Sequence, residues 1–331
     1  MGANLSVLDH EWVLPNVMGY LGGHYLYVAP VSRTFHQTYV NVHGNTRTYR
    51  RLRFVSRDSL SWALENSRGL GMHYGNICDI AAEQGQLQIL KWARELLCPC
   101  TARTCARAAK GGHIKVLKYL RENQCPWDAD TCAQAAKGGH QKLLLWLIRN
   151  HCPVDARTCA WAACRGNISM LIDARDHGCP WDARSCNAAA RNGDMKMLQY
   201  LHDHGCPWNH RTCQEAALNE NTRIGNIEIL QYLHANGCPW NEYTFVAAAH
   251  GGHLEVLQYL RANDCSWNAD TCAAAAEGGH LEGLQYLHAN GCPWNEDTCA
   301  EAARGGGLEV LQYLHANGCP WNADTCAYAA M

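Results

Sequence analysis

Apolar and polar residues follow a helical period along most of the chain, and one pattern returns every 27 residues. It is clearest in residues 291–317, where two short segments flank a run of glycines. The apolar side chains of the second segment cover a broad arc: Leu308, Val310, Leu311, Tyr313 and Leu314. Such an arc is typical of a helix buried between neighbours on two sides. The pattern therefore predicts two short helices in each repeat.

The ends of these helices are also predicted from local residues. The first helix is expected to begin at Asp297-Thr298, with Thr298 and Glu301 forming a capping box. Gly305-Gly306 ends it, because glycine adopts the left-handed conformation at low cost. The second helix is expected over 308–316.

The spacing of the Cys-Pro pairs defines the repeat. Steps are 27 residues, except for 32 between Cys206 and Cys238, when Cys265, which holds the same place but is followed by Ser266, is included. A fixed period of this size indicates stacked supersecondary elements, and helices of roughly eight to ten residues are marginal alone in water. We therefore predict an all-α, helical-hairpin solenoid over residues 59–331, with about nine helix pairs and a terminal half.

The repeat resembles the ankyrin repeat. Residues 248–260 read Ala-Ala-His-Gly-Gly-His-Leu-Glu-Val-Leu-Gln-Tyr-Leu, and Asn-Gly-Cys-Pro-Trp-Asn-Ala stands where that family has Gly-Ala-Asp-x-Asn-Ala. The repeat is about six residues shorter than the usual 33, and Asp-Thr-Cys-Ala replaces Thr-Pro-Leu-His. The resemblance implies ankyrin-like helix pairs without the β-hairpin finger.

Composition narrows the possible functions. The net charge of −2 implies no bulk attraction to nucleic acid, and the repeats lack a consistent variable pair that would read bases, so we expect no specific nucleic acid as a partner. No apolar run approaches the length of a membrane-spanning helix. The amino terminus has no secretory signal.

Most of the twenty cysteines fall into two columns of the repeat. One column is the Cys-Pro cysteine, and the other lies in the first helix: Cys105, Cys132, Cys159, Cys186, Cys213, Cys272, Cys299 and Cys326. Stacked helices are about 8–10 Å apart, whereas a disulfide needs Cα atoms within about 7 Å. We expect reduced thiols that fill small buried sites in the cytosol or nucleus; pairing within Cys-x6-Cys is the alternative.

Residues 1–58 depart from the repeat. Leu14-Pro15, an apolar stretch ending at Tyr20-Leu21, and Val31-Ser32-Arg33-Thr34-Phe35 together resemble an F-box, although the first interval is shorter than usual by about five residues. The resemblance implies docking of a Skp1-type partner. The alternative is a helical cap that covers the first repeat.

The first residues carry a second signal. Met1-Gly2-x-x-x-Ser6 fits an N-myristoylation site at Gly2. One acyl chain anchors a protein only marginally, and the arginines of residues 47–57 could supply a second attraction. Membrane association is expected only if Gly2 is acylated.

Candidate chemistry is sparse. The Cys-x6-Cys spacing does not bring four zinc ligands together. His113, His140, His253 and His280 each follow two glycines, where we expect them to bond the backbone of the turn. No phosphate-binding glycine loop or nucleophile elbow is present. We expect no enzyme activity, cofactor or metal.

A binding face follows from the ankyrin resemblance, which implies that the exposed side of the first helix lines a concave surface. The positions concerned lie two before, two after and five after the first-helix cysteine. Between the Cys105 and Cys213 repeats they are mostly basic, against Asp130 and Glu215: Arg103, Arg107, Lys110, Lys137, Arg157, Arg184, Arg191 and Arg211. In the last four repeats they are mostly acidic, against Arg304: Asp270, Glu277, Asp297, Glu301 and Asp324.

Two functions fit this pattern. One is a protein-interaction scaffold that binds a partner through the concave face, with Trp161 as an aromatic anchor. The other is an F-box-type substrate adaptor for ubiquitin ligation. The charged face could also serve solvation alone.

Overall fold

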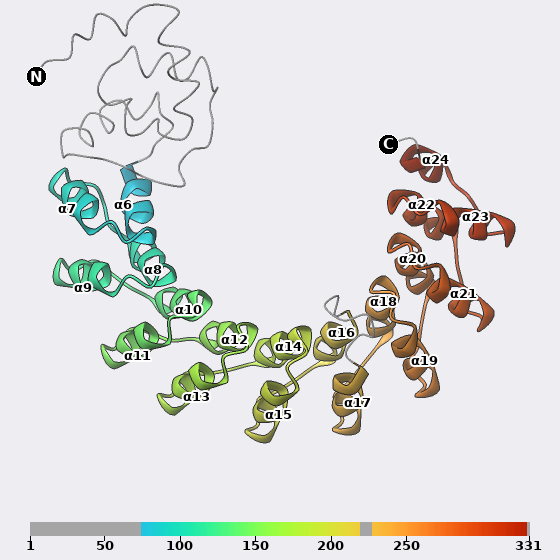
Figure 1. The fold of residues 1–331 in the computed structure, drawn as a ribbon, viewed down its shortest axis with the longest axis horizontal. Coiled ribbons are helices and arrows are strands. Elements are labelled where there is room, and N and C mark those ends of the chain that lie inside the picture. Colours follow the sequence, from blue (N-terminus) through green and yellow to red (C-terminus); the bar gives the residue numbers. More distant parts are fainter. Residues whose placement is uncertain (1–73, 219–226, 330–331) are drawn as a thin grey trace, which may run out of the picture. The chain divides into compact units, whose positions relative to one another are not determined.

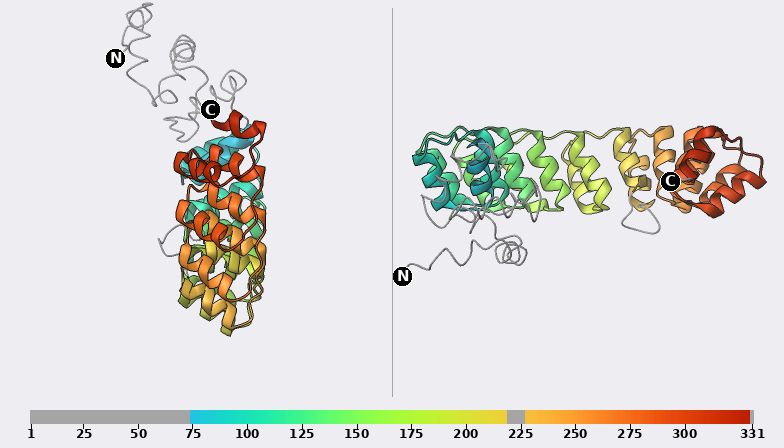
Figure 2. Two further views of the ribbon diagram at one scale, coloured as in Figure 1. Left: turned by 90° about the vertical axis from the view of Figure 1, so that its right-hand side faces the viewer. Right: turned by 90° about the horizontal axis from the view of Figure 1, so that it is seen from above.

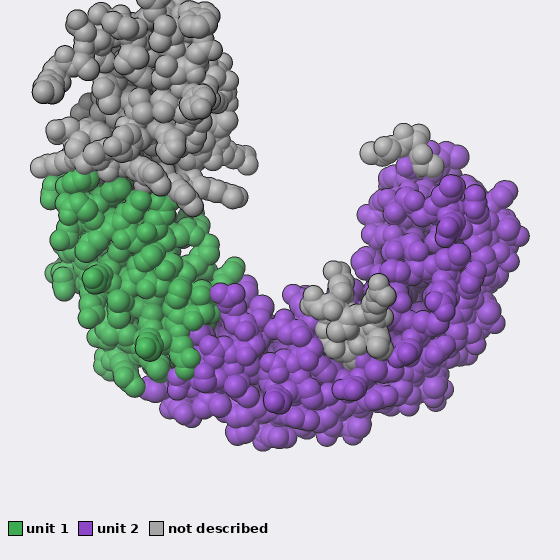
Figure 3. All heavy atoms as spheres, in the orientation of Figure 1, with its two compact units in different colours: residues 1–154 green, residues 155–331 purple. Residues whose placement is uncertain are grey.

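The computed structural model describes residues 74–218 and 227–329, and within these ranges every regular element is an α-helix (Figure 1). The chain divides into two compact units, residues 1–154 (unit 1) and 155–331 (unit 2), shown in separate colours in Figure 3. The predicted boundary near residue 58 lies outside the described residues.

Unit 1 contains three helix pairs in its described part. The helices are α6 (Tyr74–Glu83), α7 (Leu87–Glu95), α8 (Ala102–Lys110), α9 (Ile114–Glu122), α10 (Ala129–Gly138) and α11 (Gln141–Arg149).

Unit 2 contains six further pairs and one single helix. The helices are α12 (Ala156–Cys164), α13 (Ile168–Asp176), α14 (Ala183–Asn192), α15 (Met195–Asp203), α16 (His210–Leu218), α17 (Ile227–Ala235), α18 (Glu242–His250), α19 (Leu254–Ala262), α20 (Ala269–Glu277), α21 (Leu281–Ala289), α22 (Glu296–Arg304), α23 (Leu308–Ala316) and α24 (Ala323–Ala329). Over the described residues the predicted nine pairs and terminal half are confirmed.

The even-numbered helices are the first helices of the repeats, and the odd-numbered ones are the second. In each unit, consecutive first helices pack on one another, and each second helix packs on its own first helix. Figure 1 shows the two layers that result, and Figure 2 gives two further views of the same helices. The contact between first helices is close because alanines face it, as with the buried pair Ala275 and Ala276 in α20. Leucines of the second helices, such as Leu284 and Leu287, complete the core.

The helix starts differ from the sequence-based prediction. The N-cap is the Asn or Asp three residues before the threonine, and the threonine lies at the third helical position. In α22 the N-cap Asn295 and Thr298 bond each other's backbone, so Thr298 and Glu301 do not form the predicted capping box. Asn295 starts the helix because its backbone is extended and its side chain reaches the free N–H groups of the first turn.

The cysteines are free thiols, and the prediction that they fill small buried sites holds for all but Cys100, Cys164 and Cys326. Each thiol of the Cys-Pro column from Cys125 onward, including Cys265 before Ser266, donates to the carbonyl of the N-cap residue of the preceding first helix. The Cys206 Sγ, for example, lies 3.5 Å from the Asp182 carbonyl oxygen. Burial raises the pKa of Cys265 to about 12. These thiols therefore hold each loop against the start of the first helix before it.

The loop tryptophans stack on the last turn of the second helix of the same repeat. The Trp208 ring lies 4.0 Å from His202 and the Trp127 ring lies 4.1 Å from the Arg121 guanidinium. The next repeat adds a tyrosine against the edge, as Tyr232 does at Trp208. The loop-and-second-helix side of the stack is thus occupied by contacts of the chain with itself.

Histidines connect the turns between the two helices of successive repeats. The Nε2 atoms of His113, His140 and His280 lie 2.9–3.0 Å from the carbonyl oxygens of Glu83, Lys110 and His250. For these three the prediction that the imidazole bonds a turn backbone is confirmed, and the carbonyl belongs to the preceding repeat.

Several sequence-based expectations fall outside the described residues. These are the helical cap and F-box-like segment in 1–58, the acylation site at Gly2, the basic segment 47–57 and the five-residue insertion at 219–223.

Candidate protein interface on the first helices

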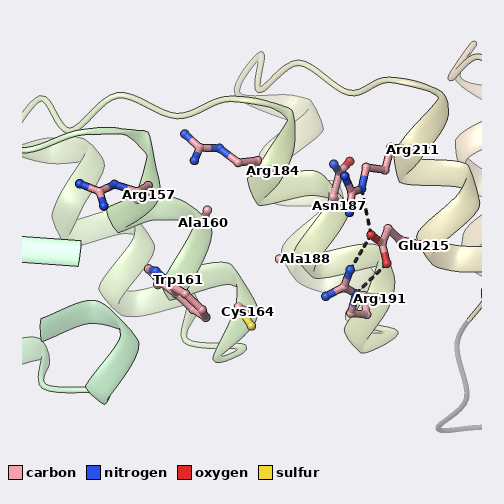
Figure 4. A pocket seen from close by; sticks show the side chains of 10 residues that line it. All are labelled: Arg157, Ala160, Trp161, Cys164, Arg184, Asn187, Ala188, Arg191, Arg211 and Glu215. Atoms are coloured by element: carbon pink, nitrogen blue, oxygen red, sulfur yellow. Dashed lines mark hydrogen bonds and ion pairs between the residues drawn. The ribbon is translucent and has the colours of Figure 1, made fainter. Parts of the chain in front are cut away.

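The predicted columns of the first helices line a groove in each unit. The groove of unit 1 has a volume of about 340 Å³ and is lined by Arg103, Ala106, Arg107, Lys110, Asp130, Gln134 and Lys137. The groove of unit 2 has a volume of about 360 Å³ and is lined by Arg157, Ala160, Trp161, Cys164, Arg184, Asn187, Ala188, Arg191, Arg211 and Glu215 (Figure 4). Eight of the predicted basic positions thus lie in grooves, four in each unit.

Acidic residues of α6 neutralise part of the basic charge in unit 1. Arg103 Nε lies 3.1 Å from the Asp79 carboxylate. Glu83 accepts from Arg107 at 2.9 Å and from Lys110 at 2.7 Å. Burial alone would raise the pKa of Glu83, but these two cations outweigh it and the pKa is lowered. The unit 1 groove is therefore close to balanced in charge.

Two of the four arginines in the unit 2 groove are held by aspartates of their own helices. Arg157 Nε lies 2.9 Å from Asp155 and Arg184 Nη2 lies 2.8 Å from Asp182. Both aspartates are N-caps that also accept from the backbone N–H of the arginine. The hydrogen bonds from Arg184 lower the pKa of Asp182. The guanidinium groups are thus oriented while remaining about half exposed.

The other two arginines share one carboxylate. Arg191 Nε donates to Glu215 Oε2 at 2.6 Å, and Arg211 Nε donates to Oε1 at 3.2 Å. The Glu215 side chain is only 6% exposed, whereas both arginines are more than half exposed. Burial alone would raise the pKa of Glu215, but the arginines outweigh it and the pKa is lowered. Figure 4 shows the three side chains together at one end of the groove.

Replacing Glu215 by glutamine is expected to change the acid stability of the protein. Because the folded-state pKa of Glu215 is lowered, its stabilisation is present above the unfolded-state pKa and is lost as the pH falls through the folded value. We expect Glu215→Gln to cost about 1 kcal/mol at pH 7, since the arginines are well solvated.

Urea unfolding at pH 7 and between pH 4.5 and 3 measures both effects. The difference between wild type and variant should shrink on acidification. A difference that stays constant down to pH 3 would contradict this role of Glu215. Glu228→Gln is the matched control, because Glu228 is exposed on the second helix α17.

The floor of the unit 2 groove is apolar. Trp161, Ala160 and Cys164 come from α12, and Ala188 comes from α14. Trp161 is half-buried, whereas the sequence suggested an exposed ring. Figure 4 shows it on the opposite side of Ala188 from Glu215. The groove therefore combines an apolar floor with a rim of guanidinium groups.

The acidic positions of the last four repeats lie outside both grooves. Asp270, Asp297 and Asp324 are exposed at the starts of their helices. Arg304 lies 2.7 Å from Glu277 and 2.6 Å from Glu301 and joins α22 to α20. Arg304, which the sequence columns already set against the acidic residues, thus pairs with two of them.

Sequence reasoning missed the partners that neutralise the arginines. Asp79 and Glu83 belong to the repeat before that of Cys105, where the predicted face began. Asp155 and Asp182 are not at the positions two before, two after or five after the first-helix cysteine. The Asp-x-Arg spacing at the helix start was the available signal. Ala160 and Ala188 gave no signal, because alanine recurs in the column of each, as at Ala133 and Ala274.

The described residues contain no cluster of three or more His, Cys, Asp or Glu side chains arranged to hold a metal ion. Within the same ranges, no helix combines the length and apolar character needed to cross a membrane.

The chain was compared with known proteins. No protein-family model matches it, and no curated protein matches it. Among solved structures it is similar to the pentatricopeptide repeat protein PPR10 from maize, at 12% identity and a TM-score of 0.43, over 98% of this chain and 57% of that one. It is also similar to PPR10 in complex with an 18-nt psaJ RNA element, at 14% identity and a TM-score of 0.34, over 98% and 64%.

This similarity is limited in extent. The chain spans less than two thirds of the length of either PPR10 chain. The neighbours are pentatricopeptide repeat proteins, not ankyrin-repeat proteins, so the ankyrin resemblance depends on the sequence motifs alone.

Proposed function

We propose that this chain is a protein-interaction scaffold that binds its partner through the first helices of its repeats. The unit 2 groove is the observation that supports this most strongly, because it places Trp161 and four arginines around one hollow. Tryptophan and arginine are the residues most enriched among energetic hot spots of protein interfaces. The loop-and-second-helix side is already occupied by intramolecular stacking.

A non-catalytic role accompanies this proposal. The groove contains arginines, a carboxylate bound by two of them, a tryptophan and the Cys164 thiol, and its only carboxylate is bound to arginines instead of acting as a base for that thiol. We also propose that the chain acts in the cytoplasm or nucleus, on the basis of its free thiols. The ankyrin-like character of the repeats is likewise proposed from the motifs.

Replacing Arg157 and Arg184 together by glutamate, which reverses their charge, is expected to slow association with the partner about tenfold at low salt. These two arginines are the best choice, since their aspartate partners are themselves partly exposed and tolerate the loss. Reversing Arg191 and Arg211 would instead leave the buried Glu215 beside new negative charges.

Affinity capture with mass spectrometry identifies the partner, and stopped-flow kinetics then measures association against salt. Lys142→Glu with Lys196→Glu is the matched control, because both lysines are exposed on second helices. Unchanged capture and unchanged rates in the groove variant would contradict the proposed face.

The alternative function is an F-box-type adaptor for ubiquitin ligation. It depends on residues 14–35, which lie outside the described residues, and it stays a proposal from the sequence resemblance. Capture of a Skp1-type protein by the full chain, and its loss when Leu14-Pro15 is changed to two alanines, would support it. Capture of the Skp1-type protein that is unchanged in the two-alanine variant would contradict the F-box-type function.

A further inference from the structure

The hollow in unit 2 arises where one small residue stands between two large ones in the same column. The position two after the first-helix cysteine is Trp161 in α12, Ala188 in α14 and Glu215 in α16. Ala188 therefore lies between a half-buried indole and a carboxylate held by two arginines. The space left above Ala188 has room for a large side chain, because its neighbours in the same column carry one.

The rim of the hollow can bind carboxylates. Each guanidinium has five N–H donors, and Arg157 and Arg184 are about half exposed beside Asp155 and Asp182. Arg191 and Arg211 share the single carboxylate of Glu215, so this end of the groove carries one more positive charge than negative. An acidic group that reaches the rim would meet donors already held in position.

The same carboxylates disfavour a polyanionic strand. Asp155, Asp182 and Glu215 lie beside the arginines that a phosphate backbone would contact. The acidic positions of α20 and α22, which include Glu277 and Glu301, would repel a strand continuing along unit 2. A segment with a few negative charges and one apolar side chain fits this arrangement better than a nucleic acid does.

The spacing of the helices limits the length of the segment. The groove crosses α12, α14 and α16, and stacked helices lie about 8–10 Å apart. The span is therefore about 16–20 Å, which an extended peptide covers with roughly six residues. Acidic residues at both ends would reach the two arginine pairs, and a central side chain would lie over Ala188.

We propose that the unit 2 groove binds an extended peptide segment of a partner protein, with acidic residues flanking one aromatic or long apolar side chain that enters the hollow above Ala188 against Trp161. This inference depends on the proposed function and names the ligand of the same face.

Selection of displayed random heptapeptides on the full-length protein tests the proposal. Counter-selection uses Ala188→Trp, which fills the hollow with the residue that α12 carries in the same column. We expect the enriched peptides to combine Asp or Glu with a central aromatic or long apolar residue. In fluorescence anisotropy, Ala188→Trp should weaken the binding of the best labelled peptide at least tenfold. Trp161→Ala should weaken it about thirtyfold.

Matched controls separate the hollow from general effects. Ala273→Val enlarges a first-helix position outside the groove, one residue after the cysteine column, where α18 already carries Val246, and should leave binding unchanged. Circular dichroism checks that Ala188→Trp is folded, and Ala188→Leu replaces it if it is not. Labelled oligouridylate of seven nucleotides is the polyanion probe and should bind at least tenfold more weakly than the best peptide.

Three results would overturn the inference. They are enrichment of basic peptides or of none, peptide binding that Ala188→Trp does not affect, and oligouridylate binding at least as tight as that of the peptide. One further result would contradict this inference and still support the proposed function. If Arg157→Glu with Arg184→Glu slows the captured partner while Ala188→Trp leaves it unaffected, the face binds a protein but the hollow is not its site.

Discussion

Replacing Phe245 by alanine is expected to lower the free energy of unfolding by about 3–5 kcal/mol, the largest effect of any single change considered. Phe245 lies in α18 in the column that cysteine fills in other repeats, and it is completely buried. Its ring lies 5.3 Å from Trp267, edge to face. Truncation therefore removes a large apolar side chain and an aromatic contact, and leaves a cavity.

Two further variants show whether the repeat is shaped around this ring. Cys272→Ala empties the same column in α20 but removes only a small side chain, so we expect a loss of about 1 kcal/mol. Phe245→Cys supplies the usual column residue and is expected to cost at least 2 kcal/mol, since the surrounding side chains remain those that pack a phenyl ring.

Urea unfolding followed by helical circular dichroism measures all three variants. A cost below about 1 kcal/mol for Phe245→Cys would show that the repeat closes around the smaller residue. The cavity argument would then be wrong for this site.

The second prediction concerns the turn before α21, where His280 lies over two glycines. A Cβ atom added at Gly278 would come within 2.5 Å of the His280 ring and 2.7 Å of the His250 carbonyl oxygen. A Cβ atom at Gly252, in the preceding turn, would meet the same ring at 2.4 Å. Gly278→Asn is therefore expected to cost about 1–3 kcal/mol through forced displacement of the ring.

The turn between α14 and α15, in the same unit, is linked to the preceding repeat by different side chains. Asn192 occupies the position equivalent to Gly278, and its Nδ2 donates to the Cys164 carbonyl oxygen at 2.7 Å. That carbonyl is equivalent to the one that His280 bonds. Asp194 stands in place of the histidine and instead caps its own helix, by accepting from the Met197 N–H at 3.0 Å. The glycine–histidine and asparagine–aspartate pairs thus make the same link between repeats.

The double variant Gly278→Asn with His280→Asp is consequently expected to have a free energy of unfolding within about 1 kcal/mol of the wild type, although each single change lowers it. A double-mutant cycle in urea should give a coupling energy of about 2 kcal/mol in favour of the pair. Gly291→Asn is the control, because a Cβ atom there meets nothing within 4 Å and its positive φ is one that asparagine tolerates. Additive losses in the cycle would show that the two turn types are not interchangeable.

The charges on the first helices show which properties the repeat columns predict and which they do not. The sequence indicated which positions share the face, because a period of 27 residues repeats the same helix phase in every repeat. It did not indicate their pairing. The partners of Arg191 and Arg107 lie on adjacent repeats, and which carboxylate meets which cation depends on how the first helices pack against each other.

The sequence by itself determined the helix pairs, their number over residues 74–218 and 227–329, and the burial of the cysteine column. These properties follow from local periodicity and from glycines at the turns, which act within a few residues of the chain. Only the tertiary structure decided that Asn295 starts α22 in place of Thr298, that Trp161 is half-buried and that a hollow opens above Ala188. The start of α22 depends on which side chain reaches the free N–H groups of the first turn, whereas the burial of Trp161 and the hollow depend on the packing of side chains from different repeats, which no single repeat encodes.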